Sequence, residues 1–199
     1  MNFLIIGGFL GAGKTSLLLQ LTAYMREKRG IEKTVILENE IGKVGIDDRV
    51  LSGAGYNVRG MFAGCVCCTM AGELPLTIKA IEQDMAPEWI IMEATGMAFP
   101  QNVKENLAQT LGIDARICCL ADAKRWPRLL KPMEHLLPLQ LKEADVVLVN
   151  KIDLVDAAAL DSVRESVTGF CGAETEIFSV SMNSEIGADV LDRILGRDA

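Results

Sequence analysis

The sequence predicts an α/β domain in which a mostly parallel sheet is covered by helices on both faces. Short apolar runs alternate with longer segments of helical character, which is the pattern of a parallel sheet with crossover helices. The first apolar run leads directly into a glycine-rich loop that ends in Lys14-Thr15, the order of a strand, a phosphate-binding loop and a helix. The 199 residues contain no internal repeat or linker, so we expect one domain over residues 1–199.

The individual elements follow from these runs. Strands are expected over Phe3–Ile6, Thr34–Glu38, Trp89–Glu93, Arg116–Ala121, Val146–Asn150 and Glu176–Val180. Helices are expected over Lys14–Arg29, Leu74–Met85, Val103–Leu111, Leu136–Glu143, Ala157–Val167 and Ile186–Leu195. The stretch from Glu40 to Thr69 has many glycines and little periodicity, and it is too long for an ordinary connection, so we expect a functional loop there.

The loop from Gly8 to Thr15 matches the pattern G-x-x-x-x-G-K-[ST] of a phosphate-binding loop (P-loop). Backbone N–H groups of such a loop close around phosphate oxygens, and the helix that follows adds positive potential. Lys14 is expected to reach the β- and γ-phosphates, and the Thr15 hydroxyl to bind Mg²⁺. A chance glycine-rich turn is the alternative. The predicted nucleotide contacts are Gly8, Gly11, Ala12, Gly13, Lys14, Thr15 and Ser16.

The segment Asn150-Lys151-Ile152-Asp153 follows a predicted strand and matches a guanine-reading motif. The Asp153 carboxylate can accept hydrogen bonds from the N1–H and the exocyclic amine of guanine, which adenine does not offer in that arrangement. Asn150 and Lys151 are expected to brace the loops around the base, with Ser181 beside it. A solvated turn is the alternative. Together with the P-loop, the motif predicts binding of GTP and GDP.

Acidic residues end two further strands. Glu93 is expected to hold the hydration shell of Mg²⁺, and the N–H of Gly96 to sense the γ-phosphate. Glu38 and Glu40 lie at the carboxyl edge, where open α/β sheets bind ligands, and could serve Mg²⁺, a transferred metal or a water molecule. Solvated strand ends are the alternative for these acids. Met97 stands where a catalytic glutamine would follow Gly96, so we expect slow hydrolysis that a partner or second subunit accelerates.

Three cysteines, Cys65, Cys67 and Cys68, stand within four residues in the long loop. The Cα atoms of neighbouring residues are about 3.8 Å apart, below the usual disulfide span of about 4.4–6.8 Å. Thiolates in such a cluster suit Zn²⁺ or another soft or borderline metal, and they leave a coordination position open for exchange. A cluster of small buried residues is the alternative. Cys118 and Cys119 are expected to be buried in a strand. Cys171 is expected to be an ordinary loop thiol, and His135 to lie on the surface or to have a packing role.

The composition of the chain indicates which classes of binding partner and which cellular compartment to expect. The formal net charge is −7 and no dense Lys/Arg cluster stands out, which argues against nucleic acid or a membrane surface as the main partner. No apolar run is long enough to span a bilayer, and the N-terminal run lacks the features of a signal peptide. Six cysteines without such a signal indicate a reducing cytoplasm, where thiols bind metal or stay free.

The motifs together resemble the CobW-type GTPases over nearly the whole chain. The resemblance is carried, in order, by G-F-L-G-A-G-K-T-S, L-E-N-E-I-G-K-V-G-I-D, G-C-V-C-C-T, I-I-M-E-A-T-G-M-A-F-P, L-A-D-A and A-D-V-V-L-V-N-K-I-D-L-V. It implies a P-loop NTPase G domain that hydrolyses GTP, delivers zinc, cobalt or nickel, or handles a cobalamin cofactor. It also implies that Cys65, Cys67 and Cys68 bind the metal. Unlike typical members, the sequence has no histidine-rich tract and carries Lys43 where some members have an acid, and we expect the G domain without the family's C-terminal domain.

The leading hypothesis is a GTPase metallochaperone with a client metalloenzyme or corrinoid protein as its partner. A homodimer that shares one metal across a twofold axis would fit a single cysteine motif per chain. One alternative is a regulatory G domain that protects or reactivates a corrinoid-dependent enzyme without delivering metal. Another is a P-loop ATPase with a structural zinc.

Overall fold

The computed structural model describes residues 1–38, 57–60, 70–96 and 99–196. Seven strands form one sheet in the order β3-β2-β4-β1-β5-β6-β7, and all the neighbouring pairs are parallel. Their bounds are Asn2–Gly8 (β1), Thr34–Glu38 (β2), Asn57–Gly60 (β3), Trp89–Glu93 (β4), Arg116–Asp122 (β5), Val146–Asn150 (β6) and Glu176–Ser179 (β7). The predicted α/β fold with a parallel sheet is confirmed.

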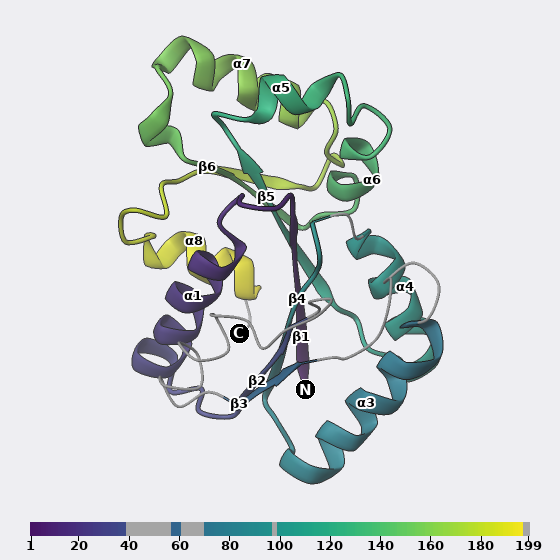
Figure 1. Ribbon diagram of the computed structural model, residues 1–199. Helices are drawn as coiled ribbons and strands as arrows, with labels where there is room; N and C mark the ends of the chain where they lie inside the picture. Colours follow the sequence, from purple (N-terminus) through teal and green to yellow (C-terminus); the bar gives the residue numbers. More distant parts are fainter. Residues whose placement is uncertain (39–56, 61–69, 97–98, 197–199) are drawn as a thin grey trace.

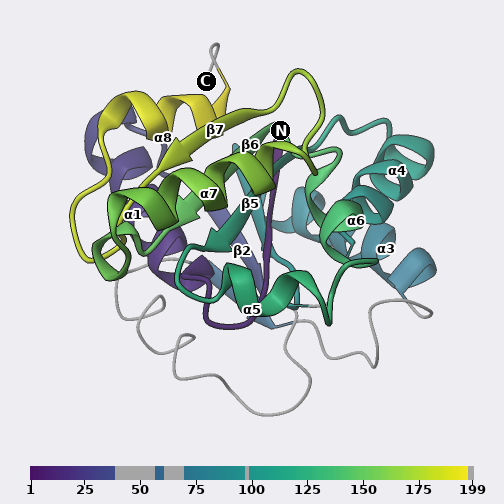
Figure 2. The same cartoon turned by 90° about the horizontal axis from the view of Figure 1, so that it is seen from above.

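Helices cover both faces of this sheet (Figures 1 and 2). Their bounds are Lys14–Arg29 (α1), Met70–Met85 (α3), Pro100–Leu111 (α4), Trp126–Leu130 (α5), Leu137–Leu141 (α6), Ala157–Thr168 (α7) and Ala188–Leu195 (α8), with a 3₁₀ turn, η1, over Ile152–Leu154. Helices α1 and α8 pack on one face, and the remaining helices contribute to the core on the other. In the described part, no helix has the length and apolar character needed to cross a bilayer.

Strand β1 shows why the apolar runs are continuous rather than alternating. Phe3 and Ile5 belong to the core on one face, whereas Leu4 and Ile6 belong to the core beneath α1 and α8. Successive side chains of a strand point to opposite faces, and here both faces are covered, so all four positions from Phe3 to Ile6 are apolar. Strand β1 therefore lies buried in the middle of the sheet, and the loop that follows it starts from a well-packed strand.

Apart from the short 3₁₀ turn η1, two described elements were not predicted. Asn57–Gly60 forms β3 at one edge of the sheet, so the expectation of an unbroken loop from Glu40 to Thr69 is wrong at these four residues. The rest of that stretch lies outside the described residues. Trp126–Leu130 forms the short helix α5. Most other boundaries agree within a few residues, although α3 begins at Met70 and α4 at Pro100, ahead of the predicted Leu74 and Val103.

The carboxyl ends of the central strands gather the polar groups. Glu93 ends β4 and pairs in register with Ile6 of β1, directly before the P-loop. Asp122 ends β5 and lies in register with Asn150, the last residue of β6. The backbone of Glu38 pairs with Glu93 from the other side. Parallel strands place all these ends at one edge, where open α/β sheets bind ligands.

Candidate nucleotide-binding site

The P-loop connects β1 to α1 through glycines in left-handed backbone conformations. Gly8 has a φ of 125° and Gly13 a φ of 109°, a region that side-chain-bearing residues rarely adopt. A Cβ atom at Gly8 would stand 2.5 Å from the carbonyl oxygen of Leu120, and one at Gly13 would meet the Asn150 amide. These glycines are therefore required by the turn itself and by the close approach of β5 and β6.

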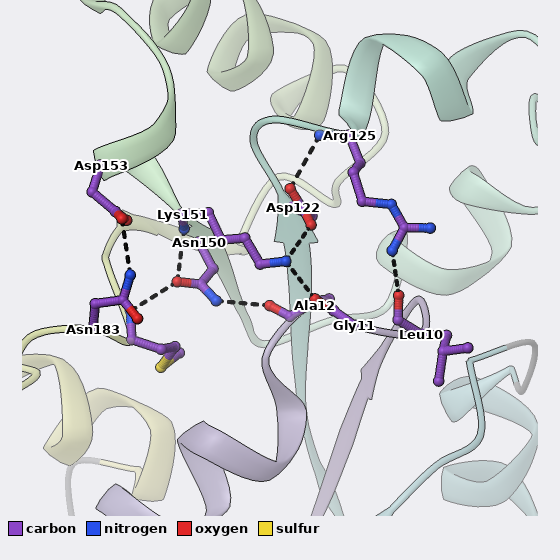
Figure 3. A network of polar contacts seen from close by, with 10 residues as sticks. Leu10, Gly11, Ala12, Asp122, Arg125, Asn150, Lys151, Asp153 and Asn183 are labelled. Carbon is purple, nitrogen blue, oxygen red and sulfur yellow. Dashed lines mark hydrogen bonds and ion pairs between the residues drawn. The ribbon is translucent and has the colours of Figure 1, made fainter.

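Three consecutive carbonyls of this loop accept hydrogen bonds from side chains at or just after the carboxyl ends of β5 and β6 (Figure 3). The Nη1 of Arg125 donates to Leu10 at 2.7 Å. Lys151 Nζ donates to Gly11 at 2.6 Å, and Asn150 Nδ2 to Ala12 at 2.7 Å. The carbonyls of Leu10, Gly11 and Ala12 thus face these side chains. The loop is held by groups far away in the sequence.

A buried carboxylate organises two of these side chains. Asp122 is only 3% exposed, and its Oδ2 lies 2.6 Å from Lys151 Nζ. Its Oδ1 accepts the backbone N–H of Arg125 at 3.1 Å. A buried charge is tolerated where it is paired and hydrogen-bonded, as here. Asp122 therefore fixes both the ammonium of Lys151 and the start of the segment that carries Arg125.

Asp153 lies at the end of the site where the base is expected. Its Oδ1 accepts a hydrogen bond of 2.6 Å from the Ser181 hydroxyl, and its Oδ2 one of 2.9 Å from Asn183 Nδ2. The hydrogen bond from Ser181, followed by that from Asn183, lowers the pKa of this carboxyl below its ordinary value despite some desolvation. Asp153 is thus held as an oriented carboxylate, the form that accepts the two N–H donors of guanine.

The opposite end of the site carries the groups expected at the phosphates and the magnesium ion. The Thr15 hydroxyl donates to Glu93 Oε2 at 3.3 Å, and Lys14 Nζ lies 3.7 Å from Glu93 Oε1. Hydroxyl and carboxylate oxygens are hard ligands that suit Mg²⁺. Thr15 and Glu93 therefore fit a magnesium ion beside the phosphates, with Lys14 as the neighbouring cation. Ser16 follows in α1 and is exposed.

Gly96 lies against the P-loop, where a Cβ atom would come within 2.7 Å of the Leu10 nitrogen. Its carbonyl accepts a hydrogen bond of 3.0 Å from Nε2 of Gln140, a buried side chain of α6. The carbonyl of Gln140 in turn accepts the thiol of Cys119 at 3.1 Å. The turn after β4 is therefore anchored to a helix as well as to the loop it touches.

The predicted metal ligands are only partly within the described residues. Glu40, Cys65, Cys67 and Cys68 lie outside them, and for Glu38 only the backbone register beside Glu93 is described. Within the ranges that the structure describes, no three His, Cys, Asp or Glu side chains form a metal-binding group. The assignment of the transition metal to the cysteine motif stays a prediction.

The remaining cysteines behave as packing residues. Cys118 and Cys119 are fully buried in β5, as predicted, and burial raises the pKa of Cys119 to about 12. Burial also raises the pKa of the partly buried Cys171 to about 11. Thiols of this kind stay protonated near neutral pH and are poor metal ligands. His135 is exposed and lies 3.5 Å from Glu134, which agrees with a surface role.

Four residues of the site were given no role from the sequence: Asp122, Arg125, Gln140 and Asn183. Asp122 belongs to the L-A-D-A segment that carried part of the resemblance, and it ends a strand at the ligand-binding edge, so a signal existed. Asn183 follows Ser181 by two residues. Arg125 and Gln140 lie in or next to short helices without a motif, and only their contacts with Leu10 and Gly96 identify them.

A P-loop that is tied to an N-K-x-D loop defines the class of this molecule as a P-loop nucleotide-binding domain of the GTPase type. The family model for the CobW/HypB/UreG nucleotide-binding domain matches residues 2–178, and the chain belongs to this family. The resemblance inferred from the motifs is confirmed.

Among curated relatives, the zinc chaperone CobW of Sinorhizobium sp is 30% identical, over 94% of this chain and 60% of the relative. The zinc chaperone YeiR of Escherichia coli K12 is 32% identical, over 75% of this chain and 46% of the relative. The chain thus spans about half of the length of these proteins.

Solved structures with the same fold include HypB from Helicobacter pylori in complex with nickel, with a TM-score of 0.63, 16% identity, and coverage of 98% of this chain and 82% of that one. HypB from Archaeoglobus fulgidus gives a TM-score of 0.65 at 15% identity, over 96% of this chain and 87% of that one. Both likenesses support the α/β fold.

Proposed function

We propose that this chain is a GTPase metallochaperone domain that binds GTP with Mg²⁺, hydrolyses it slowly, and couples the nucleotide state to a transition metal held by Cys65, Cys67 and Cys68. One observation carries the nucleotide part. Asn150 and Lys151, in the segment that leads into Asp153, bond directly to the P-loop, whose Lys14 and Thr15 contact Glu93. This connection supports one site for a guanine base and a triphosphate.

Selectivity for guanine follows from the state of Asp153. Its carboxylate is oriented by Ser181 and Asn183, so an incoming base must supply donors to it. Guanine supplies N1–H and the exocyclic amine, whereas adenine would leave the carboxylate unpaired. A site built on such hydrogen bonds rejects a base without the matching donors by a large factor.

Slow hydrolysis fits the groups around Glu93 and Gly96. Lys14 supplies a cation for the β- and γ-phosphates, and Mg²⁺ when bound neutralises charge on the phosphate oxygens. No glutamine follows Gly96 to orient the attacking water. Chemistry of this kind relies on positioning and electrostatics, so a partner or a second subunit that adds a polar group would accelerate it.

The metal part of the proposal is supported by the thiol chemistry of the cysteine motif and by relatives that are named zinc chaperones. Two or three thiolates bind Zn²⁺, Co²⁺ or Ni²⁺ while leaving a position for exchange with a client protein. Zn²⁺ is the first metal to test. Delivery to a client metalloenzyme in the cytoplasm, or to a corrinoid-related pathway, completes the proposed role.

The decisive experiment titrates Zn²⁺, Co²⁺ and Ni²⁺ against a competing chelator with the protein nucleotide-free, bound to GDP, and bound to a non-hydrolysable GTP analogue. We expect metal affinity to differ between the two nucleotide states, because two ligands that favour the same conformation stabilise each other. The Cys67→Ser/Cys68→Ser variant should lose the site, while Cys171→Ser is the matched control. Equal metal affinity in all states, or an unaffected double variant, would contradict metal coupling and favour a regulatory G domain.

A separate experiment tests the base. Asp153→Asn replaces one acceptor with an N–H donor, which suits xanthine because xanthine carries a carbonyl where guanine carries its amine. The variant should lose affinity for GDP and gain affinity for the xanthosine diphosphate. A wild-type protein that prefers ADP to GDP would refute the guanine assignment and revive a P-loop ATPase.

A further inference from the structure

Arg125 stands at the rim of the P-loop, outside both nucleotide motifs. Its Nη1 donates a hydrogen bond of 2.7 Å to the carbonyl of Leu10 (Figure 3). A Cβ atom at Gly11 would lie 3.2 Å from the same nitrogen. The side chain is exposed, yet it contacts the backbone of a loop 115 residues earlier in the chain.

The base of this side chain is held in place. The backbone N–H of Arg125 bonds both to the carbonyl and to the side chain of Asp122, each at 3.1 Å. Asp122 is buried and paired with Lys151, which itself donates to Gly11. Arg125 is therefore part of the same framework that orients the rest of the loop, and its position does not depend on a flexible surface segment.

Peptide geometry gives this contact a direction. In a planar trans peptide, the C=O of one residue and the N–H of the next point to opposite sides. Because the Leu10 carbonyl is turned toward Arg125, the N–H of Gly11 is turned away from it. Backbone N–H groups of a P-loop are the donors that hold the phosphates. Arg125 thus sets the orientation of one such donor.

The neighbours of Leu10 indicate which phosphate this donor faces. Gly96, the residue expected at the γ-phosphate, lies against the Leu10 nitrogen. Glu93, whose Oε1 lies 3.7 Å from Nζ of Lys14 in the same loop, ends the strand that leads into Gly96. The Leu10–Gly11 peptide is therefore on the side of the loop where the terminal phosphate will lie, away from Asp153.

We propose that Arg125 is a positioning residue for the terminal phosphate of the bound nucleotide, acting through the Leu10–Gly11 peptide. This inference rests on the proposed GTP binding and adds a cation that neither motif contains. The guanidinium also places a positive charge near the negative triphosphate, which favours binding of GTP over the less charged GDP. Its loss therefore weakens binding of GTP more than binding of GDP.

The test compares Arg125→Ala and Arg125→Lys with Arg128→Ala. Arg128 is an exposed arginine of α5, the short helix that begins directly after Arg125, so its removal deletes the same charge three residues further on. Affinities for GDP and for a non-hydrolysable GTP analogue are measured by titration with Mg²⁺ present, together with kcat, KM and the thermal midpoint. We expect Arg125→Ala to lose about tenfold in affinity for the GTP analogue and clearly less for GDP.

We also expect Arg125→Lys to recover part of the loss, because an ammonium can donate to the Leu10 carbonyl, and Arg128→Ala to match the wild type. Equal losses for both nucleotides, or a loss that lysine does not recover, would show a general structural role and overturn the inference. Identical behaviour of Arg125→Ala and Arg128→Ala would overturn it too. A wild-type protein that binds neither guanine nucleotide would instead refute the proposed function, and the inference with it.

Discussion

The side chain of Asn150 joins the base-recognition loop to Ala12 of the P-loop, with 2.7 Å between Nδ2 and the Ala12 carbonyl oxygen. Its Oδ1 accepts the backbone N–H groups of Lys151 at 2.7 Å and Met182 at 2.9 Å. One buried amide therefore links three loops that follow β1, β6 and β7. The P-loop and the proposed base-recognition loop are therefore tied together by one side chain.

Replacing Asn150 with alanine should destabilise the fold as well as the site. The change leaves a buried carbonyl and two N–H groups without their partner, at a cost of about 1–3 kcal/mol for each group that stays dry. We expect a loss of at least about 2 kcal/mol in the free energy of unfolding, measured by urea denaturation, and weaker GDP binding. Asn102→Ala, at an exposed position of α4, is the control and should change stability by less than about 0.5 kcal/mol. A stable Asn150→Ala variant would show that water replaces the amide.

Removing the Ser181 hydroxyl should raise the pKa of Asp153. The hydrogen bond from Ser181 is the largest cause of the lowered pKa, and that from Asn183 is smaller. Ser181→Ala should therefore raise the pKa more than Asn183→Ala does, as followed by carbon NMR of the carboxyl group. The lowered pKa contributes stability above the ordinary value of about 3.9, and this contribution is lost as the pH falls through the lower folded value. The opposite order of the two variants would mean that Asn183 is the dominant partner.

The Gln140→Leu variant should loosen the turn that contains Gly96. The side chain is buried, and its Nε2 donates to the Gly96 carbonyl at 3.0 Å. Leucine fills a similar volume without the donor, so the turn loses its anchor to α6. Hydrogen exchange of the peptide amides from Glu93 to Gly96 should become faster. Gln101→Leu, on α4 near the surface, is the matched control. Unchanged exchange in Gln140→Leu would show that packing against the P-loop alone holds the turn.

The buried thiols should resist alkylation in the folded protein. Burial raises the pKa of Cys119 to about 12 and that of Cys118 well above its ordinary value, so neither forms the reactive thiolate near pH 8. Cys171, with a pKa raised to about 11, should react slowly. Mass spectrometry after brief iodoacetamide treatment should find Cys118 and Cys119 unmodified until the protein is unfolded. Rapid native modification of either one would reveal local opening of β5.

The same thiols predict a loss of stability at high pH. Each folded-state pKa lies above the ordinary value of about 8.5, so the protonated thiols contribute stability that is complete below that value. The contribution is lost progressively as the pH rises from the ordinary value toward the folded values of about 11 for Cys171 and about 12 for Cys119. Urea denaturation between pH 8 and 11 should show a falling midpoint, and Cys171→Ala should reduce the slope. A flat profile would contradict the burial of these groups.

The sequence predicted six of the seven strands because buried parallel strands are continuous apolar runs between helices. Strand β3 was missed because Asn57-Val58-Arg59-Gly60 has one β-branched residue and pairs with β2 alone. Helix α5 was missed because its five residues are too few for a periodic pattern and include a proline. Local patterns predict an element only when it is long enough to repeat them.

The site shows a similar division. Gly8 to Thr15 and Asn150 to Asp153 were predicted because each motif is contiguous and its chemistry is local. The contacts of Arg125 with Leu10 and of Gln140 with Gly96 join residues 115 and 44 positions apart. Such pairs depend on which strand ends are neighbours in the sheet, and the sequence pattern gives that order only after the fold is known.

The internal ion pairs of the site also affect the stability of the protein without a bound nucleotide. Lys14 is paired with Glu93, and Lys151 with Asp122, so these two lysines do not repel each other as an exposed pair of bare cations would. A phosphate group that reaches Lys14 takes over a role that Glu93 already fills. On nucleotide binding, Lys14 would then exchange its Glu93 partner for a phosphate group, while the surrounding backbone is already in place. The described part of the protein should therefore keep its fold in the absence of any nucleotide.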